Sequence, residues 1–245
     1  MTSGPVLILG ANSDIGTSIV HKFANEGYDI QLAARKLPIL KIKYENLDSK
    51  YNIKVNFYEF DVLKTDTHIN FIENLEQLPS IIICTIGCMG NQGENEIKSD
   101  LRINVLRTNY EGPVNILSEF ANFFERRGSG TIVGISSAAG DRGRSTNYIY
   151  GSAKSGFSTF LSGLRNRLAR KNVHVVTVLP GPVYTKMTAG LELPKLITTY
   201  PDKVSKDIYQ AVLKKKNIIY TTGIWRLIMI LIKFIPEGIF KKFKI

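Results

Sequence analysis

Cysteine and histidine are scarce in this sequence, with two cysteines, Cys84 and Cys88, and three histidines in 245 residues. Zinc sites need several such side chains at close spacing, and disulfide frameworks are typical of short secreted chains, so neither is expected. The first ten residues lack the basic start and long apolar run of a signal peptide. We therefore expect a cytoplasmic protein without a bound metal.

The chain also lacks linkers, low-complexity tracts and internal repeats before residue 213. Its length and its 44% hydrophobic residues suit one well-buried domain. Eight basic residues against Glu237 place +7 of the net charge of +11 in residues 214–245. We expect a domain over residues 1–223 and a basic, apolar tail over residues 224–245 that is not a separate domain.

Short apolar runs alternate with helical patterns along the chain. The runs read as buried strands over residues 5–10, 29–35, 55–62, 80–87, 131–137 and 173–181. This alternation predicts an α/β Rossmann fold, a doubly wound parallel sheet with helices on both faces. Ligands in such sheets bind at the carboxyl ends of the strands, which is where functional residues are expected.

The first strand leads into "ILGANSDIG", residues 8–16. Gly10 permits a tight turn, Gly16 permits close packing of the next helix, and backbone N–H groups at the helix start face a phosphate. The loop therefore predicts a dinucleotide site made by Gly10, Asn12, Ser13, Asp14, Ile15 and Gly16. Asp14 replaces the usual middle glycine, and its carboxylate would either cap the helix or repel a phosphate.

Arg35 follows the second strand, where the cofactor ribose is expected. A free 2′-hydroxyl would call for an acidic residue there, whereas a 2′-phosphate calls for an arginine. The alternative is an ordinary exposed arginine on a loop. Given the preceding glycine loop, Arg35 favours NADP(H) over NAD(H).

Tyr150 and Lys154 lie four residues apart in "YGSAK", which places them on one face of a helix. The Lys154 ammonium would favour the phenolate and lower the pKa of Tyr150, so that the tyrosine transfers a proton near neutral pH. Ser137, thirteen residues earlier at the end of the fifth strand, could hydrogen-bond a substrate carbonyl. The tyrosine–lysine spacing alone is weak evidence, but together with the serine and the glycine loop it indicates an active site.

These motifs resemble those of the short-chain dehydrogenase/reductase family over about residues 6–186. The resemblance implies hydride transfer between NADP(H) and a carbonyl or carbinol carbon, with Tyr150 as the proton-transfer group, Ser137 positioning the oxygen and Lys154 binding the ribose. It further implies a water held by Asn109, adenine contacts from Asp61 and Val62, and nicotinamide-side contacts from Gly87, Pro180, Gly181, Val183 and Thr185. A homo-oligomer is also implied. The sequence departs from the family pattern at Asp14 and at Thr85–Ile86, where the family has Asn–Ala.

The tail, "GIWRLIMILIKFIPEGIFKKFKI", is too short in its apolar part to span a membrane. Arg226 and Lys233 share one helical face and leave a broad apolar surface. Three interpretations remain: peripheral contact with anionic lipid, a dimer-forming helix, or a cover over the substrate cleft. The basic residues lie among apolar ones, which argues against nucleic-acid binding.

The tail also resembles, more loosely, a branch of this family with reductases of cell-wall and polysaccharide assembly, such as the decaprenylphosphoryl keto-ribose reductase. That resemblance implies a lipid-linked keto-sugar substrate at the inner face of a membrane. The alternatives are a reductase of a hydrophobic soluble ketone or 3-oxoacyl substrate, and a non-catalytic NADP-binding regulator. Residues 186–201 are expected to form a substrate flap lined by Met187, Leu191, Leu193 and Leu196, with the alternative that these four side chains only pack on the core.

Overall fold

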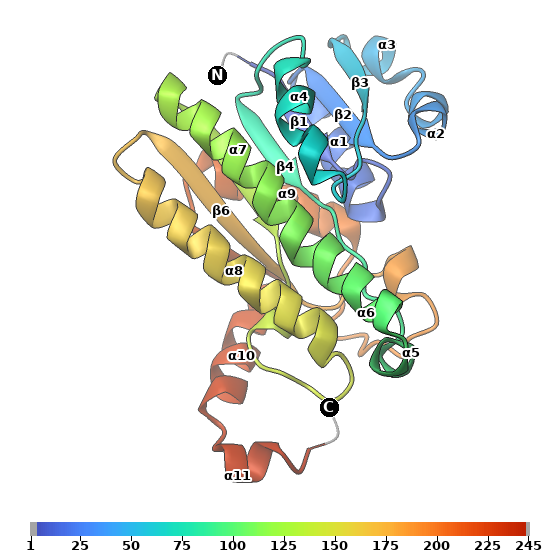
Figure 1. Ribbon diagram of the computed structural model, residues 1–245, viewed down its shortest axis with the longest axis vertical. Coiled ribbons are helices and arrows are strands. Elements are labelled where there is room, and N and C mark those ends of the chain that lie inside the picture. Colours follow the sequence, from blue (N-terminus) through green and yellow to red (C-terminus); the bar gives the residue numbers. More distant parts are fainter. Residues whose placement is uncertain (1–3, 244–245) are drawn as a thin grey trace.

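The computed structural model describes residues 4–243 and contains one parallel sheet of seven strands in the order β3-β2-β1-β4-β5-β6-β7 (Figure 1). The predicted Rossmann fold is therefore confirmed. Residues 1–3, part of the stretch in which no signal peptide is expected, and residues 244–245 of the tail lie outside the described residues. The strands are β1 Val6–Leu9, β2 Ile30–Ala34, β3 Val55–Glu59, β4 Ile81–Cys84, β5 Gly130–Ile135, β6 Val173–Pro180 and β7 Ile218–Thr221.

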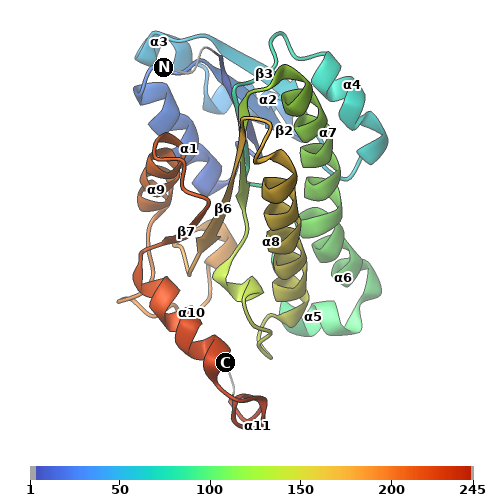
Figure 2. The same ribbon diagram turned by 90° about the vertical axis from the view of Figure 1, so that its left-hand side faces the viewer.

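Helices cover both faces of this sheet (Figure 2). On one face lie α1 Asp14–Asn25, α2 Leu37–Lys43, α3 Leu47–Tyr51 and α9 Pro201–Leu213. On the other lie α4 His68–Glu73, α7 Gly112–Arg127 and α8 Tyr148–Leu168, with α5 Gln92–Ile97 and α6 Ser99–Leu106 at the end of that layer. The tail forms α10 Ile224–Phe234 and α11 Glu237–Phe240, which extend beyond the sheet.

Strands β1 and β4, at the centre of the sheet, are apolar at every position because both of their faces are buried. In β1, Val6 and Ile8 pack into the core beneath α1 and α9, and Leu7 and Leu9 pack into the core beneath α7 and α8. All four side chains are fully buried. Burial on both sides replaces the alternation of apolar and polar residues expected of a half-exposed strand.

Two parts of the fold were not anticipated from the sequence. Strand β7, Ile218–Thr221, pairs with β6 at the edge of the sheet. It has four residues and is only partly buried, so the sequence shows no long apolar run there. In addition, the helical stretch between β4 and β5 is interrupted between α6 and α7 by a turn of π-helix, η2 Arg107–Glu111. That turn contains Asn109, and such bulges are frequent at functional sites.

Candidate active site

A cavity opens at the carboxyl ends of β1, β4, β5 and β6. The predicted site residues that line it are Ile15, Gly87, Ser137, Tyr150, Lys154, Pro180, Gly181, Val183 and Thr185. The rest of the predicted set lies beside it: the glycine loop next to Ile15, Asn109 behind Gly87, and Arg35, Asp61 and Val62 after the neighbouring strands β2 and β3. The structure thus brings residues from eight chain segments to one edge of the sheet.

The glycine loop has the backbone geometry that its sequence predicts. Gly10 has φ +85°, a left-handed conformation that favours glycine. A Cβ at Gly16 would lie 2.6 Å from the carbonyl oxygen of Gly10, so a larger residue would push the helix away from the loop. Thr85, one of the departures from the family pattern, supports this turn through hydrogen bonds from its Oγ1 to the carbonyl oxygens of Leu9 and Gly10.

Asp14 does not cap helix α1, and one oxygen of its carboxylate is already engaged in a hydrogen bond. The N-cap is Ser13, whose hydroxyl accepts a hydrogen bond from the Gly16 amide at 3.0 Å. The Asp14 carboxylate accepts instead from the backbone N–H of Lys186 at 2.6 Å. Lys186 begins the 3₁₀ turn η4, Lys186–Thr188, in the predicted flap. The aspartate therefore ties the flap to the glycine loop.

Arg35 is exposed directly after β2, with its side chain on the surface beside the loop. Asp61 follows β3, and its carboxylate accepts a hydrogen bond from the Leu63 amide, while Val62 is buried. Sequence reasoning overlooked Lys43 of α2, whose ammonium donates to the backbone oxygen of Asn12 and to the Thr17 hydroxyl. This lysine adds positive charge to the same end of the sheet.

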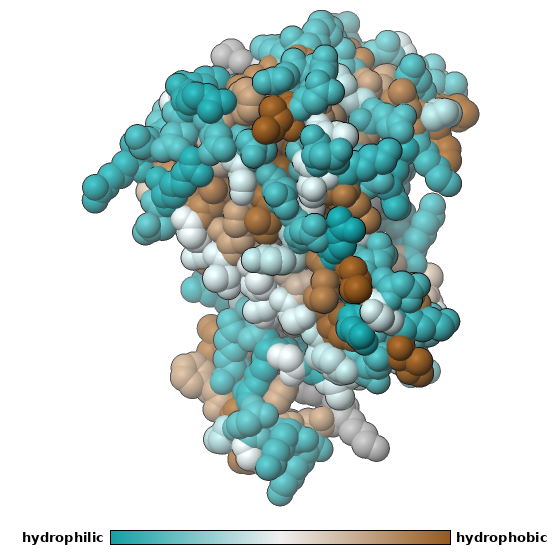
Figure 3. All heavy atoms as spheres, in the orientation of Figure 1, coloured by the Kyte–Doolittle hydropathy of each residue, from teal (hydrophilic) through white to brown (hydrophobic). Residues whose placement is uncertain are grey.

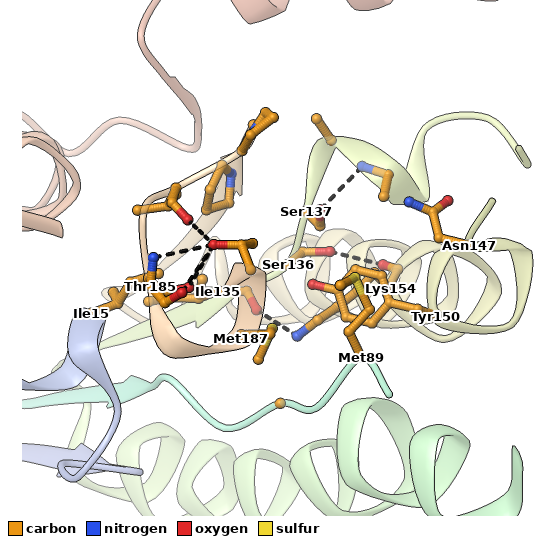
Figure 4. Close-up of a pocket in the computed structure, with 18 of the residues that line it drawn as sticks. Ile15, Met89, Ile135, Ser136, Ser137, Asn147, Tyr150, Lys154, Thr185 and Met187 are labelled. Atoms are coloured by element: carbon orange, nitrogen blue, oxygen red, sulfur yellow. Dashed lines mark hydrogen bonds between the residues drawn. The ribbon is translucent and has the colours of Figure 1, made fainter. Parts of the chain in front are cut away.

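Ser137 and Tyr150 lie next to each other in the cavity lining. Ser137 follows β5 and its hydroxyl accepts a hydrogen bond from the Ala139 amide at 3.1 Å, while Tyr150 lies in the first turn of α8. Figure 4 shows Tyr150 and Lys154 close together on α8, on the side of the cavity opposite Ile15. Burial raises the pKa of Tyr150 to about 12, and the Ser137 hydroxyl acts in the opposite direction. The expected lowering by Lys154 is therefore wrong, because desolvation of the phenolate dominates.

Lys154 is a buried cation, with 3% of its surface exposed. Its ammonium donates to the carbonyl oxygen of Ile135 at 3.0 Å and lies 5.8 Å from the centre of the Tyr150 ring. Burial lowers the pKa of Lys154 to about 8, since the charged form loses its hydration. Lys154 is therefore close to its titration point at neutral pH.

Asn109 is fully buried behind Gly87. Its amide nitrogen donates to the backbone oxygens of Cys88 and Val105, which leaves Oδ1 without a partner. A Cβ at Gly87 would lie 2.8 Å from that Oδ1 and 3.2 Å from the Lys154 ammonium. The glycine thus leaves a small polar space between the two groups.

The flap, residues 186–201, closes one side of the cavity. Met187, Leu191 and Leu193 line it as expected, whereas Leu196 is 99% exposed and takes no part, which corrects the prediction for that residue. Leu196 lies beyond the segment that the Asp14 contact holds against the loop, so it faces outward.

Helix α10 supplies a wall of the cavity, which agrees with the third interpretation of the tail. Trp225 is buried against Ala138, lines the cavity and donates from its indole nitrogen to the Ile197 carbonyl oxygen at 2.8 Å. A Cβ at Gly181 would lie 2.1 Å from that indole nitrogen, so the predicted Pro–Gly loop makes room for the tryptophan. One face of the tail therefore covers the cleft of its own domain.

Arg144 and Asn147 also line the cavity and were not anticipated. They lie between β5 and α8 in a stretch with no periodic pattern, so only the folded chain places them near Tyr150. Among residues 4–243, no cluster of His, Cys, Asp and Glu side chains could hold a metal ion. No helix within that range combines the length and apolar character needed to cross a membrane.

Comparison with known proteins identifies the family of this chain. Residues 5–195 match the family model of the short chain dehydrogenases. An uncharacterized oxidoreductase of Mycobacterium tuberculosis is 28% identical over 243 residues, covering 98% of this chain and 97% of that protein. The 3-oxoacyl-[acyl-carrier-protein] reductase of Aquifex aeolicus is 28% identical over 191 residues, 76% of each chain.

A solved short-chain dehydrogenase from Sphingobium yanoikuyae, in complex with NADPH, has the same fold. Its TM-score is 0.82 at 20% identity, covering 96% of this chain and 97% of that one. The likeness extends through almost the whole sheet and its helices, so the arrangement of strands that positions the cavity is shared.

Proposed function

This chain belongs to the short-chain dehydrogenase family, and we propose that it is an NADP(H)-dependent oxidoreductase that transfers hydride between the nicotinamide and a carbonyl or hydroxyl carbon. The observation that carries the proposal is the convergence of Ser137, Tyr150 and Lys154 in one cavity beside the glycine loop. Retention of all three groups, with Asn109 behind them, argues against a non-catalytic regulator.

The residues at the site fit a bound dinucleotide. Two buried side-chain oxygens, Asn12 Oδ1 and Asn109 Oδ1, have no partner within residues 4–243. At Gly10 and Gly16 a Cβ would clash with neighbouring atoms of the site, so only glycine permits this close turn of the backbone. The first N–H groups of α1 have no acceptor inside the helix and face the loop. Asp61 and Val62 would contact the adenine, and Pro180, Gly181, Val183 and Thr185 would lie against the nicotinamide.

In this proposal NADPH supplies the hydride, and the protein supplies position and a proton. Tyr150, with its pKa of about 12, holds a proton at neutral pH and donates it to the substrate oxygen. Ser137 donates a hydrogen bond to that oxygen. Lys154 binds the ribose hydroxyls, and Asn109 holds a water in the space beside Gly87 through which Lys154 exchanges protons.

Arg35 tests the cofactor part of this proposal. Replacing Arg35 with serine should weaken NADPH binding about 10- to 100-fold and leave NADH binding nearly unchanged, because a charge-assisted hydrogen bond to the 2′-phosphate is worth roughly 1.5–3 kcal/mol. Fluorescence titration with each cofactor would measure both affinities. Arg170→Ser, an exposed arginine outside the site, is the control for net charge. Equal losses for both cofactors would contradict the assignment.

For the substrate we propose an apolar carbonyl compound, with a lipid-linked keto-sugar as the leading candidate and a soluble hydrophobic ketone or 3-oxoacyl compound as the alternative. The cavity wall supports an apolar substrate, since Met89, Met187, Leu191, Leu193 and Trp225 line it. The match to a 3-oxoacyl-[acyl-carrier-protein] reductase supports the alternative. Relative kcat/KM for long-chain and short-chain ketones would separate an apolar site from a polar one.

We further propose that the tail docks on an anionic membrane surface. On α10, Ile224, Leu227, Ile230, Leu231 and Phe234 form one exposed apolar stripe at helical spacing, while Trp225 and Met229 face the protein. Lys241 and Lys242 are exposed at the end of the tail. In Figure 3 the end of the molecule made by α10 and α11 carries apolar side chains beside hydrophilic ones. This combination suits a lipid interface with negative headgroups.

Vesicle sedimentation would test the membrane contact. We expect the protein to sediment with phosphatidylcholine vesicles that contain phosphatidylglycerol. It should bind vesicles of pure phosphatidylcholine at least about tenfold more weakly, since each lysine contributes on the order of 1 kcal/mol. Leu231→Ser, at a side chain that is 70% exposed, should weaken binding without affecting the fold. Ile42→Ser, at an exposed side chain on α2, is the control. Unchanged binding by Leu231→Ser would contradict the proposal.

The protein is also proposed to be a homo-oligomer. Ile97, Ile103, Leu106 and Tyr110 are exposed on and next to α5 and α6, where Figure 3 shows apolar side chains gathered. Sedimentation velocity would test this, and a monomer at micromolar concentration would contradict it.

A further inference from the structure

Two arginines flank Gly143 in the segment between β5 and α8, and their surroundings differ. Arg142 is fully engaged by the tail: its guanidinium donates to the carbonyl oxygens of Ile232 and Ile235 and pairs with the Glu237 carboxylate at 2.9 Å. Arg142 therefore has a structural role, because it fastens the end of α10 to the loop that follows Ser137.

Arg144 has no comparable partners. Its Nε is buried without a hydrogen bond, and its Nη2 meets the thioether sulfur of Met229 at 3.3 Å, which is a weak acceptor. The nearby Asp141 is already used, since one carboxylate oxygen lies 2.9 Å from the Lys233 ammonium and the other accepts from the Tyr220 hydroxyl. Within residues 4–243, no carboxylate pairs with Arg144.

A partly buried cation without a direct ion-pair partner is costly to keep in a folded protein. Burial lowers the pKa of Arg144, and the nearby Asp141 carboxylate opposes this only in part. A second polar atom in the same place is also unsatisfied, because Asn147 Oδ1 is buried and has no partner. Both side chains therefore have hydrogen-bonding capacity that the protein itself does not use.

This capacity faces the cavity that holds Ser137 and Tyr150, because Arg144 and Asn147 belong to its lining. It lies on the substrate half of the sheet: Arg144 follows β5, whereas the glycine loop and Arg35 follow β1 and β2. Arg144 also contacts α10, which closes the cavity beyond β7. The charge is thus separate from the positions that would hold the cofactor phosphates.

We propose that Arg144 binds an anionic group on the substrate, so that the enzyme acts on an apolar carbonyl compound or alcohol that carries a phosphate or a carboxylate. This inference rests on the proposed function, since it names the substrate class of the same cavity. A guanidinium presents parallel N–H donors that match the oxygens of either anion. Asn147 Oδ1 is an acceptor, so it would take a hydrogen bond from a hydroxyl group elsewhere on the same substrate and would not contact the anion.

The test is binding of three probes, n-hexyl phosphate, hexanoate and 1-hexanol, to the NADPH-saturated protein by isothermal titration calorimetry. At least one anion should bind the wild type tenfold or more tightly than Arg144→Met, and Arg144→Lys should fall between them. Binding of 1-hexanol should not change. Arg170→Met, which removes an exposed charge, should match the wild type. The anion that responds identifies the headgroup as phosphate or carboxylate.

Equal affinity of both anions for the wild type and Arg144→Met would overturn the inference, as would anions that bind no better than 1-hexanol. Arg170→Met should reduce a neutral ketone such as 2-octanone as fast as the wild type, because Arg170 is exposed and lies outside the cavity lining. If the wild type reduced no ketone while hexyl phosphate or hexanoate still depended on Arg144, the proposed reaction would be wrong and the anion site would stand.

Discussion

Replacing Tyr150 with phenylalanine is expected to lower kcat for ketone reduction by roughly 10³-fold or more. The substitution removes one oxygen atom from a side chain that lines the cavity opposite the glycine loop. The ring stays, so packing around α8 and the affinity for NADPH should change little. Single-turnover measurements of NADPH oxidation with a saturating ketone would isolate the chemical step from substrate binding.

Tyr148→Phe is the matched control for this experiment. Tyr148 lies two residues earlier at the start of the same helix, is 45% exposed and is absent from the cavity wall. Its variant should keep wild-type kcat. If Tyr150→Phe retained more than about a tenth of the wild-type kcat, the phenol would not be the proton donor.

The second large effect is expected from Lys154→Met, which should nearly abolish turnover yet stabilise the protein. At pH 7 the wild type keeps a charged Lys154 ammonium that is only 3% exposed. The free-energy cost of removing this charge from water is what lowers the pKa of Lys154 from 10.5 to about 8. A lowering of that size corresponds to roughly 3–4 kcal/mol of unfolding free energy. Methionine fills a similar volume without the charge, so the variant should be more stable at pH 7 by about that amount.

The pH dependence of this gain has a definite sign. Below about pH 8 both the folded and the unfolded chain carry the proton on Lys154, and the folded state has the full cost of the buried charge. Between pH 8 and 10.5 the folded state gives up its proton first, so the unfolded state binds more protons and the wild type gains stability as pH rises. The advantage of the variant should therefore shrink over this window.

Urea unfolding of both proteins at pH 7 and pH 9.5 would measure the difference. Tyr150 is present in both proteins, so its own titration above pH 10 affects the comparison little. A variant less stable than the wild type at pH 7 would show that the hydrogen bond from Lys154 to Ile135 outweighs the buried charge.

The sequence alone predicted the central strands, the glycine loop and the Ser137–Tyr150–Lys154 set. These features are local: each depends on an apolar run, on one turn or on two residues four apart on a helix. The strand β7 was missed because Ile218 and its neighbours are only half-buried at the sheet edge, which leaves a weak apolar pattern.

The rest of the site depends on contacts between distant segments. Asp14 meets Lys186 across 172 residues, and Arg144 meets Met229 across 85. Nothing in the local pattern around either residue indicates these partners. The direction of the pKa shift of Tyr150 was predicted wrongly for a related reason, because burial depends on every segment that closes the cavity and not on the nearby lysine alone.

The wall that Trp225 contributes has a consequence for biosynthesis. The chain is made from its N-terminus, so the glycine loop, Ser137, Tyr150 and Lys154 all leave the ribosome before Trp225 does. The chain through β7, which includes α9, contains both cores and can assemble before α10, because domains generally fold from the N-terminal side during synthesis. The nascent enzyme therefore has its reactive groups in place before its substrate cavity is closed, and α10, fastened by Arg142, is the last part to complete it.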